Sequence, residues 1–189
     1  MRWWFAIKNA WQQRAYLKRF MCSADYQIHA LEEVTPQKLE EANVAILVLD
    51  FDGVLAGHDA KEPTEDAARW LRSLSHSIGE QRIAILTNKP KPERVRYFAE
   101  HFPSILLVQG TKKKPYPDGL QAIAAYKGLP PHRLGLIDDR LLTGMLATCL
   151  SYTHGWYFYP ARTHFWRHPI KESFFAFLRW FERAMVRIF

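Results

Sequence analysis

The chain has 189 residues, a net charge of +7 at neutral pH and two cysteines. This length suits one domain, which buries roughly 70% of the surface that its unfolded chain exposes and needs no disulfide framework. No stretch reaches the roughly 18 apolar residues of a membrane-spanning helix, and the first 20 residues lack the apolar core and cleavage site of a signal peptide. We therefore predict a cytoplasmic protein, and the wide separation of Cys22 and Cys149 favours a reducing compartment.

The charge is unevenly distributed along the chain. Residues 1–20 carry a net charge of +5 and residues 161–189 carry +4, which leaves −2 for the part between them. Both ends are also rich in aromatic residues. This distribution predicts an N-terminal amphipathic, basic and aromatic helix at 1–22, a central domain at 23–160 and a C-terminal amphipathic helix at 161–189.

The N-terminal helix is expected to place Trp4, Ile7 and Trp11 on one side. Helices that combine aromatic and basic residues are suited to lie in the interface of an anionic membrane, where each basic residue contributes about 1 kcal/mol. An apolar stripe can instead pack on its own domain, and a basic patch can bind nucleic acid. The aromatic crowding favours lipid over nucleic acid.

The central segment alternates between apolar runs typical of strands and segments with helical spacing. The helices are expected near 63–74, 92–102 and 118–129, with Thr64 as an N-cap and Gly128 as a stop signal. The strands are expected at 44–50, 82–87, 104–109, 134–138 and 152–158. The alternation predicts an α/β fold of the Rossmann-like type, with a mainly parallel sheet covered by helices on both faces.

The C-terminal helix is expected to carry two distinct faces. Arginines recur at every fourth position at Arg179, Arg183 and Arg187. The other face carries Phe174, Phe177, Phe181, Met185 and Ile188. With the N-terminal helix it would form a peripheral membrane anchor that does not span the bilayer.

Polar side chains follow four of the expected strands. In a parallel sheet the carboxyl ends of the strands share one edge, where ligands bind, so these side chains are expected to converge. They are Asp50 and Asp52, Thr87 and Asn88, Lys114, and Asp138 and Asp139. Converging carboxylates repel one another unless they hold a cation, and an oxygen-only set suits Mg²⁺, with Mn²⁺ as an alternative.

This residue set also suits phosphoryl transfer. One carboxylate can attack phosphorus, and a second can protonate the leaving alkoxide and later activate water. A threonine hydroxyl and a lysine can hold the phosphoryl oxygens against their growing charge. A strand-end turn with capping aspartates is the alternative interpretation of Asp50 and Asp52 alone.

Four ordered motifs resemble those of the haloacid dehalogenase (HAD) superfamily: DFDGV at 50–54, LTN at 86–88, KKP at 113–115 and IDDR at 137–140. The resemblance implies Asp50 as nucleophile and Asp52 as general acid/base. It further implies that Thr87, Asn88 and Lys114 hold the phosphate. Mg²⁺ would be bound by Asp50, the backbone carbonyl of Asp52 and Asp139.

Residues 26 to about 160 are most similar to the YqeG-like phosphatases of HAD subfamily IIIA, which include phosphatidylglycerophosphate phosphatases. The segment DDRLLTGML resembles the family's fourth motif, G-D-x-L-L-T-D, with Asp138 in place of the glycine and Gly144 in place of the second acid. The departure leaves open whether Asp138 or Asp139 contacts the metal. The resemblance implies hydrolysis of phosphatidylglycerophosphate on the inner face of a membrane, with an anionic phospholipid head group as partner.

The spacing of the motifs leaves no room for an inserted cap domain. Thr87 follows Asp52 by 35 residues and Lys114 follows Asn88 by 26, in each case enough for one helix and one strand. A capless site is open and suits a phosphate displayed on something large. The alternatives are a phosphatase of a soluble or polymeric phosphomonoester, including nucleic-acid ends, and a non-catalytic membrane or nucleic-acid tether. The oligomeric state stays open.

Overall fold

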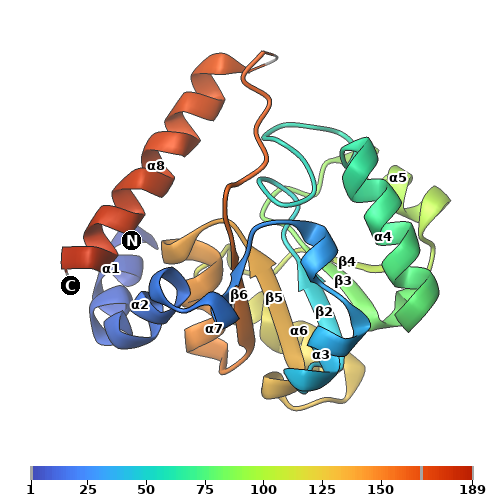
Figure 1. Cartoon of the computed structure of the whole chain (residues 1–189), viewed down its shortest axis with the longest axis horizontal. Coiled ribbons are helices and arrows are strands. Elements are labelled where there is room, and N and C mark those ends of the chain that lie inside the picture. Colours follow the sequence, from blue (N-terminus) through green and yellow to red (C-terminus); the bar gives the residue numbers. More distant parts are fainter. Residues whose placement is uncertain (1, 167, 189) are drawn as a thin grey trace.

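The computed structural model describes residues 2–166 and 168–188. Its centre is a six-stranded sheet in the order β1-β6-β5-β2-β3-β4, in which every neighbouring pair is parallel (Figure 1). The strands are β1 (Gln27–Ile28), β2 (Ile46–Leu49), β3 (Ile83–Leu86), β4 (Leu106–Val108), β5 (Leu134–Asp138) and β6 (His154–Phe158). The predicted Rossmann-like α/β fold is confirmed.

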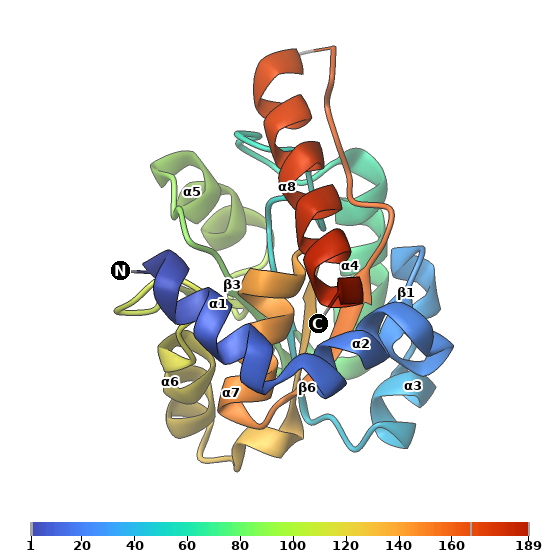
Figure 2. The same ribbon diagram turned by 90° about the vertical axis from the view of Figure 1, so that its left-hand side faces the viewer.

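Helices cover both faces of the sheet (Figures 1 and 2). One face is covered by α3 (Pro36–Glu41), α4 (Glu65–Ile78) and α5 (Pro92–His101). The other is covered by α1 (Arg2–Gln12), α2 (Arg14–Cys22), α6 (Asp118–Lys127), the π-helical turn η5 (Leu141–Met145), α7 (Leu146–Ser151) and α8 (Pro169–Ile188). The short 3₁₀ turns are Ala24–Tyr26, Leu31–Glu33, Glu80–Arg82 and Pro131–Arg133.

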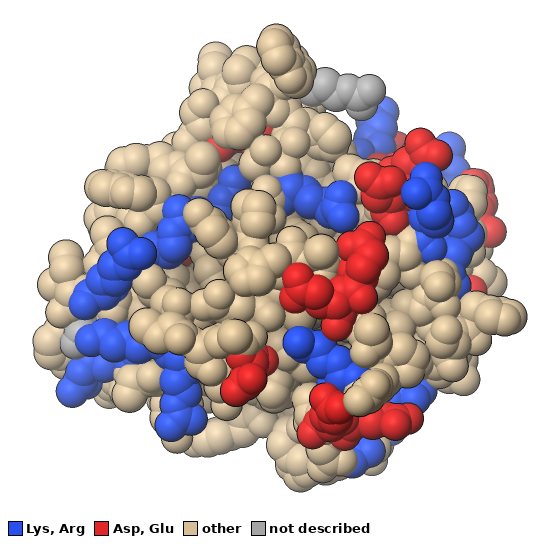
Figure 3. Space-filling model, viewed as in Figure 1, with Lys and Arg blue, Asp and Glu red and all other residues tan. Residues whose placement is uncertain are grey.

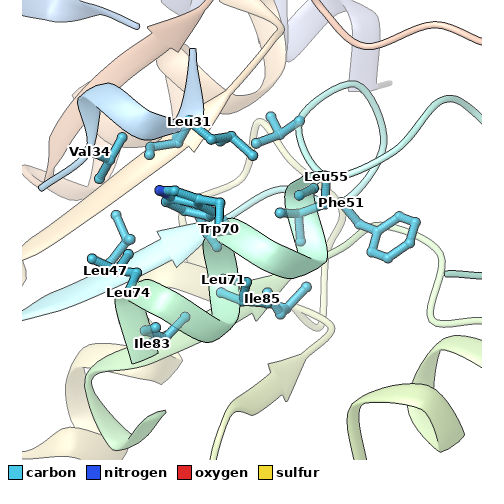
Figure 4. Packing of buried hydrophobic residues seen from close by; sticks show 14 of the residues in the cluster. Leu31, Val34, Leu47, Phe51, Leu55, Trp70, Leu71, Leu74, Ile83 and Ile85 are labelled. Atoms are coloured by element: carbon cyan, nitrogen blue, oxygen red, sulfur yellow. The ribbon is translucent and has the colours of Figure 1, made fainter. Parts of the chain in front are cut away.

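The apolar runs form strands because both of their faces are buried. Along β2, Leu47 and Leu49 enter the core on the α4 side, and Ile46 and Val48 enter the core on the opposite side. Figure 4 shows the first core, where Trp70 and its neighbours on α4 pack over β2 and β3. Successive side chains of a strand alternate between faces, so a continuous apolar run is what a doubly covered strand requires.

The five expected strands are present, each with ends within about two residues of the expected range, which is the usual uncertainty of element ends. The Thr64 hydroxyl caps α4 by accepting a hydrogen bond from the backbone N–H of Ala67 at 3.3 Å. Gly128 ends α6 in the left-handed conformation. Strand β1 was not predicted, because two residues are too short to show an alternation.

The N-terminal segment differs in detail from the single expected helix. It forms two helices, α1 and α2, that meet at Gln13. They pack on the core through small or apolar residues, Ala6 and Ala10 on α1 and Leu17 and Phe20 on α2. The tryptophans of α1 lie outside this contact and are exposed.

The C-terminal helix α8 buries charged side chains and exposes apolar ones, unlike an ordinary surface helix. The side chains that it buries include three charged ones, Glu172, Arg179 and Glu182. Six of its large apolar side chains are exposed: Ile170, Phe174, Phe177, Trp180, Phe181 and Ile188. Within residues 2–166 and 168–188, no helix is both long enough and apolar enough to cross a bilayer.

Candidate active site

The seven polar residues predicted from the strand ends lie in one region. A cavity of about 380 Å³ opens beside the carboxyl ends of the strands, and Asp50, Asp52, Asn88, Lys114 and Asp139 line it. Thr87 and Asp138 are buried close to it, at the ends of β3 and β5. The convergence that parallel strands impose is therefore present for the whole set.

Lys114 connects two of the carboxylates. Its Nζ lies 2.9 Å from Oδ1 of Asp50 and 2.5 Å from Oδ2 of Asp138, and it is only 4% exposed. Burial disfavours the charged ammonium, but the two carboxylates more than offset this effect and raise the pKa of Lys114. The lysine is therefore a fixed positive charge beside Asp50.

Asp138 fills the space left by a missing side chain. A Cβ atom added at Gly144 would lie 2.0 Å from Cγ of Asp138, so the carboxyl group of Asp138 occupies the place where a side chain at position 144 would begin. Asp138 also accepts a hydrogen bond from the backbone N–H of Arg140 at 2.9 Å. Both of its oxygens are thus engaged by protein donors, which makes Asp139 the freer of the two for a metal ion.

Asp139 lies against the turn after β2. Gly53 has a φ of +90°, and a Cβ atom there would come within 2.2 Å of Oδ2 of Asp139. The same oxygen accepts a hydrogen bond at 2.7 Å from Nη1 of Arg179, on α8. Only glycine permits both this backbone conformation and this close approach.

Asp52 is held from behind by an arginine. Nη2 of Arg94 lies 2.6 Å from Oδ1 of Asp52, and Nη1 lies 3.0 Å from Oδ2. The guanidinium group stacks on the ring of Phe51, 3.8 Å from its centroid. The pair therefore fixes the orientation of the Asp52 carboxylate, and the side chain of Asp52 also lines the cavity.

Thr87 and Asn88 shape the loop after β3. Oγ1 of Thr87 accepts a hydrogen bond from the backbone N–H of Lys89 at 3.2 Å. Oδ1 of Asn88 accepts one from the backbone N–H of Lys114 at 3.0 Å, which ties this loop to the loop that carries the lysine. Of the two, only Asn88 lines the cavity.

The acidic groups form a candidate metal centre. Among the described residues, Asp50, Asp138 and Asp139 offer oxygens that all lie within 4.8 Å of one another. Burial raises the pKa of Asp50 well above its ordinary value, and burial together with Asp138 raises the pKa of Asp139 to about 6. Burial and the neighbouring charges disfavour the ionised form of these carboxylates, and a bound cation would offset that effect. Their hard oxygen atoms fit a divalent cation such as Mg²⁺. The carboxylate of Asp52 is not in this group.

Several residues of the site were not predicted from the sequence. Arg94 and Arg179 pair with Asp52 and Asp139, and Glu182 pairs with Arg140 at the cavity wall. Helical periodicity could have indicated that Arg94 is buried, because Arg94 and Phe98 are four residues apart and both face the core. In α8 the buried charges recur at helical spacing on one face, opposite the aromatic residues.

The two terminal helices form part of the cavity wall. Trp3 and Ala6 of α1 and Phe174, Phe175 and Leu178 of α8 line it together with the aspartates Asp50, Asp52 and Asp139. The intervals between the motifs contain no inserted domain, as expected, since only single helices, strands and short turns lie there. The site is nevertheless less open than a bare sheet edge, because the ends of the chain border it.

Comparisons with known proteins give fold likenesses only. No protein-family model matches the chain, and no curated protein matches it. An uncharacterised protein from Corynebacterium glutamicum is similar in structure, with 23% identity, a TM-score of 0.49 and coverage of 68% of this chain and 91% of that one.

Two further solved structures show weaker likenesses. The cobalt-bound deoxy-D-mannose-octulosonate 8-phosphate phosphatase of Haemophilus influenzae is 19% identical, with a TM-score of 0.42, over 53% of this chain and 61% of that one. A HAD family hydrolase from Deinococcus radiodurans, with bound phosphate and sodium, is 17% identical, with a TM-score of 0.43, over 65% of this chain and 84% of that one. At these values the likenesses carry no argument about activity.

Proposed function

We propose that the protein is a Mg²⁺-dependent phosphomonoesterase of the HAD superfamily that acts on a phospholipid head group at the surface of an anionic membrane. The observation that carries the proposal is the arrangement of Asp50, Asp52, Lys114 and Asp139 around one cavity. Phosphatidylglycerophosphate is the substrate to test first, because of the resemblance of the motifs to the YqeG-like phosphatases.

The chemistry has two halves. A carboxylate oxygen of Asp50 attacks phosphorus, and the ester P–O bond breaks as Asp52 gives its proton to the leaving alkoxide. Water then attacks the aspartyl-phosphate, Asp52 takes a proton from that water, and phosphate leaves Asp50 in its original form. The ammonium of Lys114, 2.9 Å from Asp50, offsets the negative charge of the transferring group.

Asp50, Asp139 and the backbone carbonyl of Asp52 would hold the metal ion. When bound, Mg²⁺ supplies charge neutralisation for the phosphoryl oxygens. In the structure described here, the three clustered carboxylates are opposed by the cations of Lys114 and Arg179, which leaves net negative charge for a divalent cation.

The cavity rim favours an anionic substrate. Arg2, Lys89 and Lys113 line the cavity, and no ion pair or hydrogen bond to another described residue engages their charged groups. Figure 3 shows that one group of lysine and arginine side chains lies over the end of the molecule formed by α1, α2 and the C-terminal part of α8. Unpaired cations around a site attract anionic groups and anionic surfaces.

The exposed aromatic side chains favour a lipid surface. Trp4 of α1 is 77% exposed and Phe177 of α8 is 55% exposed. On the same two helices, Trp3 and Phe174 reach the cavity itself. An enzyme that docks through these side chains would bring its cavity against the head groups, where a membrane phosphomonoester is displayed.

The proposal is tested by phosphate release from phosphatidylglycerophosphate in mixed micelles with Mg²⁺, in parallel with the soluble ester glycerol 3-phosphate. We expect turnover of the lipid that Asp50→Asn abolishes. Turnover of the soluble ester alone would retain the aspartyl-phosphate chemistry and reject the lipid. Release from neither, with a folded protein, would reject the phosphatase and favour a non-catalytic tether.

Vesicle binding tests the membrane surface separately. The variants Trp4→Ser and Phe177→Ser lie outside the cavity lining, and we expect each to weaken binding to vesicles rich in phosphatidylglycerol. The control is Tyr126→Ser, because Tyr126 is 73% exposed but lies on α6 and not on a terminal helix. Equal binding by all three variants would reject this surface as the docking face.

A further inference from the structure

We infer that Arg94 is a positioning residue for the general acid/base, and that catalysis of proton transfer by Asp52 depends on their bidentate pair. The inference rests on the proposed function and adds a residue that the motifs do not contain. Arg94 lies on α5, 42 residues after Asp52 in the chain.

Each of the three nitrogens of the Arg94 guanidinium donates a hydrogen bond. Nη1 and Nη2 bind the two oxygens of Asp52 at 3.0 and 2.6 Å. Nε donates to the backbone carbonyl of Ala60 at 2.9 Å, and Nη1 also donates to the carbonyl of Lys89 at 3.3 Å. A planar group with three fixed anchors cannot rotate without losing several hydrogen bonds, so it defines the plane of the Asp52 carboxylate.

Burial shows that the arginine acts from behind and does not bind the substrate. Arg94 is 1% exposed and does not line the cavity, whereas the side chain of Asp52 is partly exposed and does. The ring of Phe51 covers the face of the guanidinium. A phosphate in the cavity therefore meets Asp52 and not Arg94.

The hydrogen bonds of Arg94 also connect two loops of the proposed active site. Asp52 belongs to the turn after β2, and Lys89 belongs to the loop after β3 that follows Thr87 and Asn88. Because one guanidinium binds both, the acid/base is held at a fixed place relative to the loop expected to bind phosphate. Proton transfer requires hydrogen-bond distance between the carboxyl group and the ester oxygen, so small displacements reduce it strongly.

The test compares leaving groups. An alkoxide needs a proton when it leaves, whereas 4-nitrophenolate does not. We expect Arg94→Lys, which keeps the charge and loses the bidentate geometry, to lower kcat/KM for glycerol 3-phosphate by about 10- to 100-fold, because kcat/KM reports the step in which the ester bond breaks. The loss with 4-nitrophenyl phosphate is expected to be clearly smaller. In an Asp52→Asn background the same substitution is expected to cost nothing further, because the group that it positions is absent.

The control is Arg82→Lys. Arg82 is also partly buried and donates to two backbone carbonyls, those of Val44 and Ala45, but it lies outside the cavity lining. We expect this variant to change stability without any dependence on the leaving group. Thermal unfolding of every variant is measured alongside.

Each outcome decides the inference. Equal losses with both esters, or additive losses with Asp52→Asn, would make Arg94 a structural residue and overturn it. If Arg94→Lys does not fold, Arg94→Gln replaces it, and failure of both to fold would also overturn it. If the wild-type protein releases phosphate neither from these two esters nor from phosphatidylglycerophosphate, the proposed function has failed rather than the role of Arg94.

Discussion

The exchange of Asp138 and Gly144 gives the sharpest prediction about the site. The variants are Asp138→Gly, Gly144→Asp and the double variant that moves the carboxylate from position 138 to position 144. The double variant is expected to retain most of the stability and activity that each single variant loses. The reason is that both positions compete for one space beside Lys114.

The structure sets the size of the single effects. Asp138→Gly removes one partner of a buried ion pair, in which Asp138 is 0% exposed, and such losses cost about 3–5 kcal/mol. Gly144→Asp places its Cβ 2.2 Å from Oδ2 of Asp138 and adds a second carboxylate beside the first. Overpacking alone costs about 1–3 kcal/mol, and the like charges add to it.

The double variant removes both problems at once. Without the side chain of Asp138, the carboxylate introduced at position 144 enters the vacated space and can pair with Lys114. We therefore expect a coupling energy of about 3 kcal/mol or more between the two sites. The hydrogen bond from the backbone N–H of Arg140 to Asp138 is lost, which costs about 1 kcal/mol.

Urea unfolding of the four proteins measures the coupling, and phosphate release measures the activity. Loss of stability in the double variant equal to the sum of the single losses would refute the shared-space argument. Recovery of stability without recovery of Mg²⁺-dependent activity would instead identify Asp138 as a metal ligand in its own right, and would contradict the assignment of Asp139.

Three further predictions concern the surroundings of the site. Burial lowers the pKa of His58 to about 4, despite Asp52 and Glu172 nearby, so the folded state excludes a proton that the unfolded state binds below its pKa of about 6.5. The stability that the neutral His58 provides is complete above pH 6.5 and is lost towards pH 4, so urea unfolding should show about 2 kcal/mol less stability at pH 5 than at pH 7. His58→Gln should reduce this difference, and its persistence in the variant would contradict the assignment of the effect to His58. Arg179→Met should strengthen Mg²⁺ binding about tenfold, seen as a larger rise in Tm on adding Mg²⁺, because a guanidinium no longer competes for Asp139. The control is Arg183→Met, because Arg183 contacts the hydroxyl of Tyr157 instead. An equal rise in Tm in both variants would count against competition between Arg179 and the metal ion. Gly53→Ala should lower kcat about 100-fold because the added Cβ displaces Asp139. Gly128→Ala is the control: Gly128 also has a positive φ, but an added Cβ would meet no atom within 4 Å, so the variant should lose about 1 kcal/mol of stability and keep its kcat. An equal loss of kcat in both variants would contradict the argument that Gly53 permits the close approach of Asp139.

The sheet and the convergence of the site were predictable because they follow from local patterns. The run from Val44 to Asp50 is apolar throughout, and only a strand covered on both faces buries such a run. Once the strands are parallel, the residues after them must share one edge. The positions of Asp50, Thr87 and Lys114 then follow from chain order alone.

The partners of the carboxylates at the site were harder to predict because they come from distant helices. Nothing near Asp52 or Asp139 in the sequence indicates Arg94 or Arg179, which lie 42 and 40 residues away. In α8 the hydrophobic pattern suggested that the aromatic face would be the contact face or the membrane face, without deciding between them. The buried charges decide which face contacts the domain, because charged groups are buried only where partners meet them.

The buried charges of α8 affect how the protein is completed during synthesis. Asp139 and Arg140 leave the ribosome about 40 residues before Arg179 and Glu182, so the nascent chain exposes their charged groups until the last helix arrives. Only then do the ion pairs close and the aromatic face of α8 take its place beside the cavity. A chain interrupted before Pro169 would lack part of the cavity wall and part of the exposed aromatic surface together, so a truncated product would have neither a finished cavity nor the aromatic side chains of α8.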